Sequence, residues 1–244
     1  MIVRVGAAGT AVLTLTVVGL YFKSGIALSF RLEKAIEVIM AIIETAIAVY
    51  VISIGIRYKK YVISVLSFVQ AAAMLCFVYR VKHNIEVKHA MIFDKLTAIM
   101  VLVIGLVGSL ICIYAVGYMK TYHIHHKEYK ERKSFFFAVL FLFLSAMFGI
   151  VLSNDLTWLF FCWELTTLCS FLLIGYTRTK EARNNSFRAL VINLGGGVAF
   201  AAGIIFIGIY YKTLELSVVT SMKPEAEMMI PVFFLSLAAL TKSA

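Results

Sequence analysis

Three ionisable side chains stand inside long apolar runs of the sequence: Glu44, Glu164 and Lys242. A charge near the centre of a bilayer costs at least about 2.5–3.5 kcal/mol, so each is a candidate functional group. Glu164 follows Leu156, the start of its run, by eight residues, and Lys242 follows Met229 by thirteen. At the rise of an α-helix these positions are about 12 Å and about 20 Å deep, too deep for either side chain to reach water. We therefore expect this acid and this base to lie in the same slab of membrane as a partnered pair.

A pair of this kind can move a proton without a metal ion or a prosthetic group. In a medium of low dielectric constant, an isolated lysine and an isolated carboxyl both favour their neutral forms, whereas contact between them favours the charged pair. Making and breaking the contact between Glu164 and Lys242 would therefore capture and release protons. The alternative is a static structural ion pair, or two groups that are each satisfied by backbone carbonyls.

Glu44 is a candidate accessory site, because it lies near the centre of its run without an obvious partner. It would line an aqueous path or contact another subunit. The alternative is a protonated carboxyl that is hydrogen-bonded to a nearby hydroxyl.

The composition indicates a membrane protein that crosses the bilayer many times. Hydrophobic residues make up 62% and charged residues 15% of the 244 positions, against about 45–50% and about 25% in ordinary globular proteins. A span needs about 20 mainly apolar residues. Such runs occur at 4–22, 35–56, 61–79, 96–119, 134–152, 156–176, 187–211 and 229–244. The predicted fold is an all-α polytopic transmembrane helix bundle of about eight spans, the last one incomplete.

The net charge of +10 bears on the orientation in the membrane and not on nucleic acid, which we do not expect as a partner. If the N-terminus is cytoplasmic, the inner loops hold 13 lysines and arginines and the outer loops hold 9. Because positive residues favour the cytoplasmic side, we expect a cytoplasmic N-terminus in the inner or cytoplasmic cell membrane.

The sequence predicts neither a cofactor nor a metal site in this chain. The four cysteines stand singly in apolar runs, where a small buried side chain is the usual interpretation. The histidines of the run His123-Ile124-His125-His126 lie among charged loop residues, which favours a solvated surface over a metal site.

Several segments resemble, in order and spacing, one family of membrane subunits. The longest is 153–176, SNDLTWLFFCWELTTLCSFLLIGY; the others are 94–100, DKLTAIM, 117–119, GYM, 134–138, SFFFA, and 239–244, ALTKSA. Together they resemble the antiporter-like proton-translocating subunits of respiratory complex I (subunit L type), of energy-converting membrane hydrogenases and of Mrp-type cation/proton antiporters. The resemblance divides the chain into about three N-terminal transmembrane helices, 1–93, and the start of the antiporter-like domain, 94–244.

The resemblance implies roles for the two deep charges. Glu164 falls on the essential membrane glutamate of the family and Lys242 on its middle lysine, in a charged axis that couples distant electron transfer to proton or sodium pumping. Gly197 stands where subunit L types have an aspartate. Family members continue with a second half, whereas this sequence ends directly after Lys242. We therefore expect a truncated chain, one part of a split subunit or a short relative, unable to pump without partner polypeptide.

The resulting hypothesis is a non-redox, ion-translocating membrane-arm subunit of a complex I-like or hydrogenase-type oxidoreductase. Its partners would be the other membrane-arm subunits and membrane lipid. Two alternatives stay open: a subunit of an Mrp-type cation/proton antiporter, and a non-catalytic scaffold bundle.

Overall fold

The computed structural model describes residues 2–25, 28–31, 33–125, 131–223 and 225–243. Eight helices in this part are long and apolar enough to cross a membrane, the last together with the short turn that precedes it. They are α1 (Ile2–Ser24), α2 (Lys34–Arg57), α3 (Tyr61–Arg80), α4 (Lys95–His125), α5 (Lys133–Leu152), α6 (Leu156–Ile174), α7 (Lys180–Tyr210) and α9 (Met229–Ser243). The predicted polytopic helix bundle is confirmed.

Two of the helices run past their predicted limits. Helix α4 continues to His125, six residues beyond the predicted end of its apolar run, and α7 begins at Lys180, seven residues before the predicted start of its run. Both extensions are polar and lie at the same end of the bundle. Thr179 caps α7 by accepting a hydrogen bond from the backbone N–H of Ala182, so local capping sets this start rather than hydropathy.

The opposite end of the bundle carries a small β-ribbon that the sequence did not predict. Strand β1 (Leu28–Phe30) pairs antiparallel with β2 (Met91–Phe93). Each strand has only three residues, too few to show an alternating pattern. We call this end the ribbon face; it also holds η1 (Lys82–Asn84), α8 (Leu216–Ser221) and η2 (Ala226–Met228).

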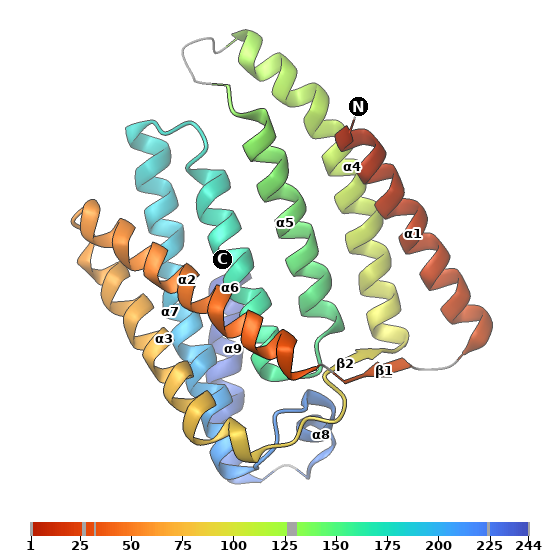
Figure 1. Ribbon diagram of the computed structural model, residues 1–244, viewed down its shortest axis with the longest axis vertical. Helices are drawn as coiled ribbons and strands as arrows, with labels where there is room; N and C mark the ends of the chain where they lie inside the picture. The colour runs from red at the N-terminus through yellow and green to blue at the C-terminus, as the bar shows by residue number, and fades with distance from the viewer. Residues whose placement is uncertain (1, 26–27, 32, 126–130, 224, 244) are drawn as a thin grey trace.

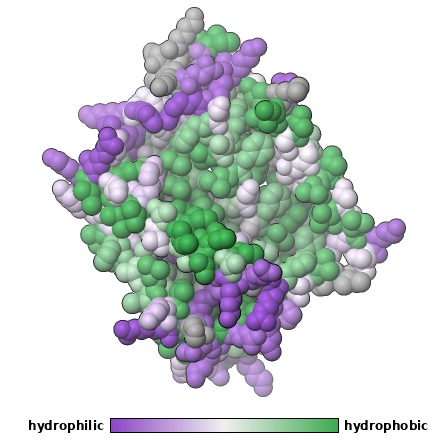
Figure 2. All heavy atoms as spheres, in the orientation of Figure 1, coloured by the Kyte–Doolittle hydropathy of each residue, from purple (hydrophilic) through white to green (hydrophobic). Residues whose placement is uncertain are grey.

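The other end is the basic face, where α2, α4 and α6 end and α5 and α7 begin (Figure 1). In a space-filling view, hydrophilic residues gather at the two ends, and a mainly hydrophobic band lies between them (Figure 2). This distribution is that of a protein that spans a bilayer several times.

The helices form two groups. Helices α1, α4 and α5 pack in that order on one side; α2, α3, α6, α7 and α9 pack on the other, and α5 joins the groups by lying against α6. The largest buried cluster of the second group holds Met74 and Phe77 of α3, Phe160 of α6, and Phe200 and Ile204 of α7. Helix α6 therefore runs between α5 and α7 with Glu164 near its middle.

Candidate membrane charge site

Helix α6, which carries Glu164, is fixed at the ribbon face by Asn154 and Asp155. The Asp155 carboxylate caps the helix by accepting from the backbone N–H and the hydroxyl of Thr157, both at 2.8 Å. The Asn154 amide donates to the carbonyl of His89 at 2.6 Å and accepts from the backbone N–H of Ser217 at 2.8 Å. These contacts tie the loop that holds His89 and the start of α8 to the start of α6, and so they fix the depth of Glu164.

Glu164 is buried at 6% exposure, and its carboxyl faces α3 and α7. A Cβ placed on Gly197 of α7 would lie 2.5 Å from Oε1 of Gln70 and 3.0 Å from Oε1 of Glu164, so both side chains point into the same small space. The Gln70 amide occupies the room that a side chain at position 197 would need. In this chain an amide from α3 therefore stands beside the buried glutamate.

Neither of these two oxygens accepts a hydrogen bond from a described residue. An amide can present either its N–H groups or its oxygen, because the two ends have nearly the same shape. Gln70 can therefore donate to an ionised Glu164 and, after a half turn of the amide, accept from a protonated one. Both protonation states of the carboxyl would then have a partner.

Lys242 reaches the same part of α6 from α9. Its Nζ donates to the hydroxyl of Thr167 at 2.7 Å and to the carbonyl of Trp163 at 3.3 Å, and it lies 4.8 Å from the centroid of the Trp163 indole ring. The close approach of α9 to α7 requires a glycine, because a Cβ on Gly196 would collide with the hydroxyl of Thr241. The Gly195-Gly196-Gly197 run lies within a continuous helix and provides this room.

Lys242 contacts the stretch of α6 that contains Glu164, but the two side chains do not form an ion pair within 4.0 Å. The ion pairs among the described residues involve other side chains. Trp163 and Thr167 are four residues apart and share one face of α6, while Glu164 is turned about 100° away from Trp163. The expected direct contact is thus absent. The Lys242 ammonium instead contacts the Thr167 hydroxyl, the Trp163 carbonyl and the Trp163 ring.

Glu44 lies on the inward stripe of α2, one helical turn after the buried Met40. Met40 belongs to one packed cluster with Phe161 and Cys162 of α6. The carboxyl is close enough to Glu164 and to Lys82 for both charges to act on it. Glu44 therefore has charged neighbours that its own segment of sequence did not reveal.

Lys82 continues this set of charges to the ribbon face. Its Nζ donates to the hydroxyl of Thr157 at 2.8 Å and lies 3.7 Å from carboxylate oxygens of both Asp155 and Glu37. Glu37 and Glu44 are seven residues apart, so they share one face of α2. The charges thus run from the partly exposed Glu37, through Lys82 and Glu44, to Glu164.

Sequence reasoning missed Gln70, Lys82 and Glu37. Gln70 had a usable signal, because it is the one amide in the apolar run 61–79. Lys82 and Glu37 had none, since each lies at the edge of a span, where charged residues are ordinary.

The histidine run lies away from this site, whereas Cys162 and Cys169 are on α6, the helix that carries Glu164. His123 is 3.0 Å from the hydroxyl of Tyr176, His125 is 2.9 Å from the carbonyl of Thr121, and His126 is outside the described residues. Cys112, Cys162 and Cys169 are buried and Cys76 is exposed, all as free thiols. Within the described residues, no group of three or more histidine, cysteine, aspartate or glutamate side chains is placed to hold a metal ion.

Two family models match the chain one after the other. The first, NADH-ubiquinone oxidoreductase (complex I) chain 5 N-terminus, matches residues 80–137, and the second, NADH:quinone oxidoreductase/Mrp antiporter transmembrane region, matches residues 153–244. The second match contains Glu164, Gly197 and Lys242.

Curated relatives come from both kinds of complex. NADH-quinone oxidoreductase subunit L of Rhodobacter capsulatus is 37% identical over 135 residues, 54% of this chain and 18% of the relative. Na⁺/H⁺ antiporter subunit A1 of Staphylococcus haemolyticus is 29% identical over 200 residues, 80% of this chain and 24% of the relative. The chain thus spans about a fifth to a quarter of the length of these relatives.

Two solved structures share the fold. The Mrp complex from Dietzia sp. DQ12-45-1b aligns with a TM-score of 0.53 at 20% identity, over 84% of this chain and 24% of the other. The membrane-bound sulfane sulfur reductase, an archaeal respiratory membrane complex, aligns with a TM-score of 0.53 at 16% identity, over 83% and 44%. From the two ordered family matches and these relatives, the chain belongs to the antiporter-like membrane subunit family shared by NADH:quinone oxidoreductases and Mrp antiporters.

Proposed function

We propose that this protein is an ion-translocating membrane subunit of a multi-subunit oxidoreductase, of the complex I-like or energy-converting hydrogenase type, and that Glu164 and Lys242 carry its proton. The single observation that carries the proposal is the contact of Lys242 with Trp163 and Thr167, which stand on either side of the buried Glu164 in the sequence of α6. Residues 94–244 would form the start of the antiporter-like domain. The N-terminal helices α2 and α3 add Glu44 and Gln70 to it.

The proposed step is a change in the separation of the two groups. When Lys242 leaves Thr167 and turns toward Glu164, the contact stabilises the ammonium and the carboxylate together. When it returns to Thr167, both separated groups become neutral in the low-dielectric interior: the ammonium releases a proton and the carboxylate takes one up, and the next contact passes that proton from Glu164 to Lys242. One proton is bound and released per cycle, and Gln70 supplies a hydrogen-bond partner in both states.

Glu44 is proposed as an accessory proton site between Glu164 and the ribbon face. It sits on the inward face of α2, where the charges of Glu164 and Lys82 both act on it. A carboxyl in this position can pass a proton between the buried centre and the partly exposed Glu37.

The test is proton movement by the assembled complex in membrane vesicles, with wild type, Glu164→Gln and the matched variant Glu86→Gln. Glu86 is an exposed carboxyl on the ribbon face, paired with Arg31 at 3.2 Å. The proposal expects Glu164→Gln to stop donor-driven proton uptake while the complex stays assembled, and Glu86→Gln to pump normally. Full coupled pumping by Glu164→Gln would refute the role of the carboxyl.

An Mrp-type cation/proton antiporter is the second candidate, because the match to the Na⁺/H⁺ antiporter subunit covers 80% of this chain. An antiporter works without an electron donor. Sodium-driven proton movement in vesicles without donor, lost in Glu164→Gln, would favour this candidate over the oxidoreductase. A scaffold subunit would instead lose only assembly on mutation of Glu164 and Lys242.

A further inference from the structure

A cavity of about 700 Å³ opens at the basic face between α2, α5, α6 and α7, away from the buried charges. Four arginines line it: Arg57 at the end of α2, Arg132 before α5, Arg178 between α6 and α7, and Arg183 in the first turn of α7. Its lining includes no aspartate or glutamate. Within the described residues, none of the four guanidinium groups has a carboxylate within 4.0 Å.

Two of the guanidinium groups are held in place by aromatic rings. Arg132 lies 5.2 Å from the ring centroid of Phe135 and 5.4 Å from that of Tyr176, and it donates to the carbonyl of Tyr176. Arg183 lies 5.3 Å from the ring centroid of Tyr58. Stacking on a ring leaves the N–H groups at the edge of a guanidinium available, and these match the oxygens of a phosphate.

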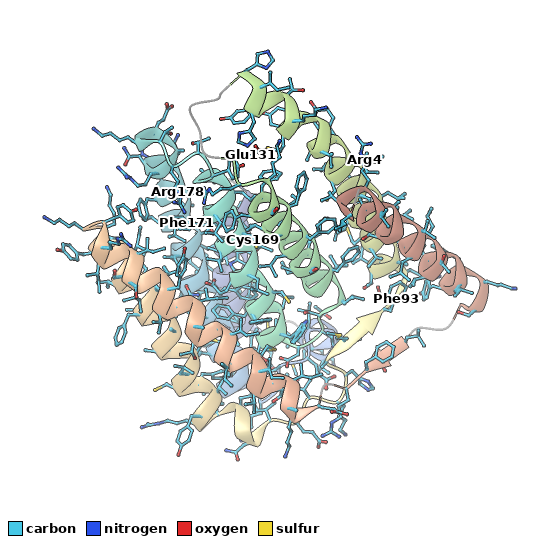
Figure 3. All side chains as sticks on the ribbon, turned by 45° about the horizontal axis from the view of Figure 1, so that its top comes forward. Arg4, Phe93, Glu131, Cys169, Phe171 and Arg178 are labelled. Atoms are coloured by element: carbon cyan, nitrogen blue, oxygen red, sulfur yellow. The ribbon has the colours of Figure 1, made fainter. Side chains whose placement is uncertain are left out.

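Arg178 has a backbone φ of 58°, in the left-handed region that few residues other than glycine adopt. Residues held in this conformation persist where the surrounding structure requires it. Arg178 adopts this conformation in the short connection between α6 and α7, and it lines the cavity. Phe171 and Arg178 lie close together where α6 reaches the basic face (Figure 3).

The rest of the lining is apolar and belongs to the membrane spans. Tyr50 and Ile54 come from α2, and Phe171 and Leu172 come from α6. Tyr50 and Phe135 are also among the large exposed side chains of the protein, so part of the wall is open at its edge. A ligand that fits must carry negative charge at one end and hydrocarbon at the other.

We propose that this cavity binds the phosphate headgroup of an anionic phospholipid, with the acyl chains along α2 and α6. Four arginines around one cavity, none of them with a carboxylate partner in the described part of the chain, attract an anion, and basic pockets between membrane helices suit the headgroups of anionic lipids. A free phosphate ion would use the arginines but leave the apolar wall uncovered. The proposal does not depend on the function proposed above, because it shares no residue with the buried charge site.

The experiment measures lipid retention by the purified protein, in its native assembly, by native mass spectrometry. The protein is titrated with dioleoylphosphatidylglycerol, dioleoylphosphatidylcholine or inorganic phosphate. We expect phosphatidylglycerol to bind about tenfold more tightly than phosphatidylcholine, because both carry a phosphate but the four arginines repel the choline cation of phosphatidylcholine. Inorganic phosphate at the same concentration should not displace it.

The paired variant Arg57→Gln/Arg178→Gln should lose the preference for phosphatidylglycerol. The matched variant is Arg188→Gln, which removes one charge from the same face but does not line this cavity. It should keep the preference within about twofold, since distant surface charges are screened by salt. Equal binding of the two lipids by wild type would overturn the proposal even if the paired variant did not fold. Full displacement of the lipid by inorganic phosphate, or an unchanged preference in a folded paired variant, would overturn it as well.

Discussion

The two helix groups differ in what they bury. Between the basic and acidic residues at their ends, α1, α4 and α5 carry no aspartate, glutamate, lysine or arginine, and their buried polar side chains are the hydroxyls of Thr14, Thr97 and Ser109. The second group buries Glu164 and Gln70 and holds Glu44 and Lys242 within its spans. A charge in a span is costly, whereas a hydroxyl can bond to its own helix.

This difference indicates that the first group serves packing and that the second group carries the candidate ion-translocating residues. Thr14 donates to the carbonyl of Thr10 at 2.8 Å, and a Cβ on Gly105 would collide with Thr14, so the polar groups between α1 and α4 serve close packing. The polar groups of the second group are arranged around α6 instead, and they belong to four different helices. We therefore expect substitutions in the second group to change ion movement and those in the first group to change only stability.

The largest effect is expected at Lys242. Lys242→Arg keeps the positive charge, but an arginine cannot release its proton in a protein. If Lys242 must exchange a proton, the arginine variant will pump as poorly as Lys242→Ala, at least about tenfold below wild type, which corresponds to about 1.4 kcal/mol in the barrier. Initial rates of proton uptake in vesicles, normalised to assembled complex, give the comparison. Pumping at the wild-type rate by Lys242→Arg would show that Lys242 acts only through its positive charge and exchanges no proton.

A smaller effect is expected at Glu44. Glu44→Gln removes the proposed accessory proton site but leaves Glu164 and Lys242 in place, so the pumping rate should fall by about fivefold, or roughly 1 kcal/mol in the barrier. The same vesicle assay measures this change, with Glu86→Gln as the control of equal charge. An unaltered rate in Glu44→Gln would leave Glu44 as a protonated structural carboxyl.

Gln70 should affect both stability and rate. Gln70→Leu removes the amide that can donate to an ionised Glu164 or accept from a protonated one, and a buried carboxyl without that partner costs about 1–3 kcal/mol of unfolding free energy. Thermal unfolding of the solubilised protein and the pumping rate are measured together, with Ser67→Ala as the control, because Ser67 is buried on the same helix. If Gln70→Leu and Ser67→Ala behave alike in both assays, Gln70 has no special relation to Glu164.

The smallest effect is expected in the first group. Ser109 is buried in α4, and its hydroxyl has no described hydrogen-bond partner, so Ser109→Ala removes little that is used. The pumping rate should stay within about twofold of wild type, which is less than about 0.5 kcal/mol in the barrier. A loss of pumping as large as that at Glu44 would erase the distinction between the two helix groups.

Most of the fold followed from hydropathy, because each span is a continuous apolar run. The ends of α4 and α7 did not, since polar extensions are held by capping and by neighbouring loops. The β-ribbon also escaped prediction, because three-residue strands depend on the pairing of loops distant in sequence. Such pairing has no local signal.

The candidate site was predictable residue by residue but not in its arrangement. A charge inside an apolar run identified Glu164, Lys242 and Glu44. Their relation depends on helix rotation: α9 meets the face of α6 that holds Trp163 and Thr167, and the carboxyl faces Gln70 instead. The rotation of α6 about its own axis cannot be predicted from the spacing of its apolar residues, because this helix is apolar on nearly all sides.

The most direct test of the central claim is a double-mutant cycle of Glu164→Gln and Lys242→Ala, with proton uptake by assembled complexes in vesicles as the readout. If the two groups exchange one proton, each single variant removes the same step, and the double variant will pump no worse than either. If the two losses multiply, the carboxyl and the lysine act independently, and the account of a proton moving between them is contradicted.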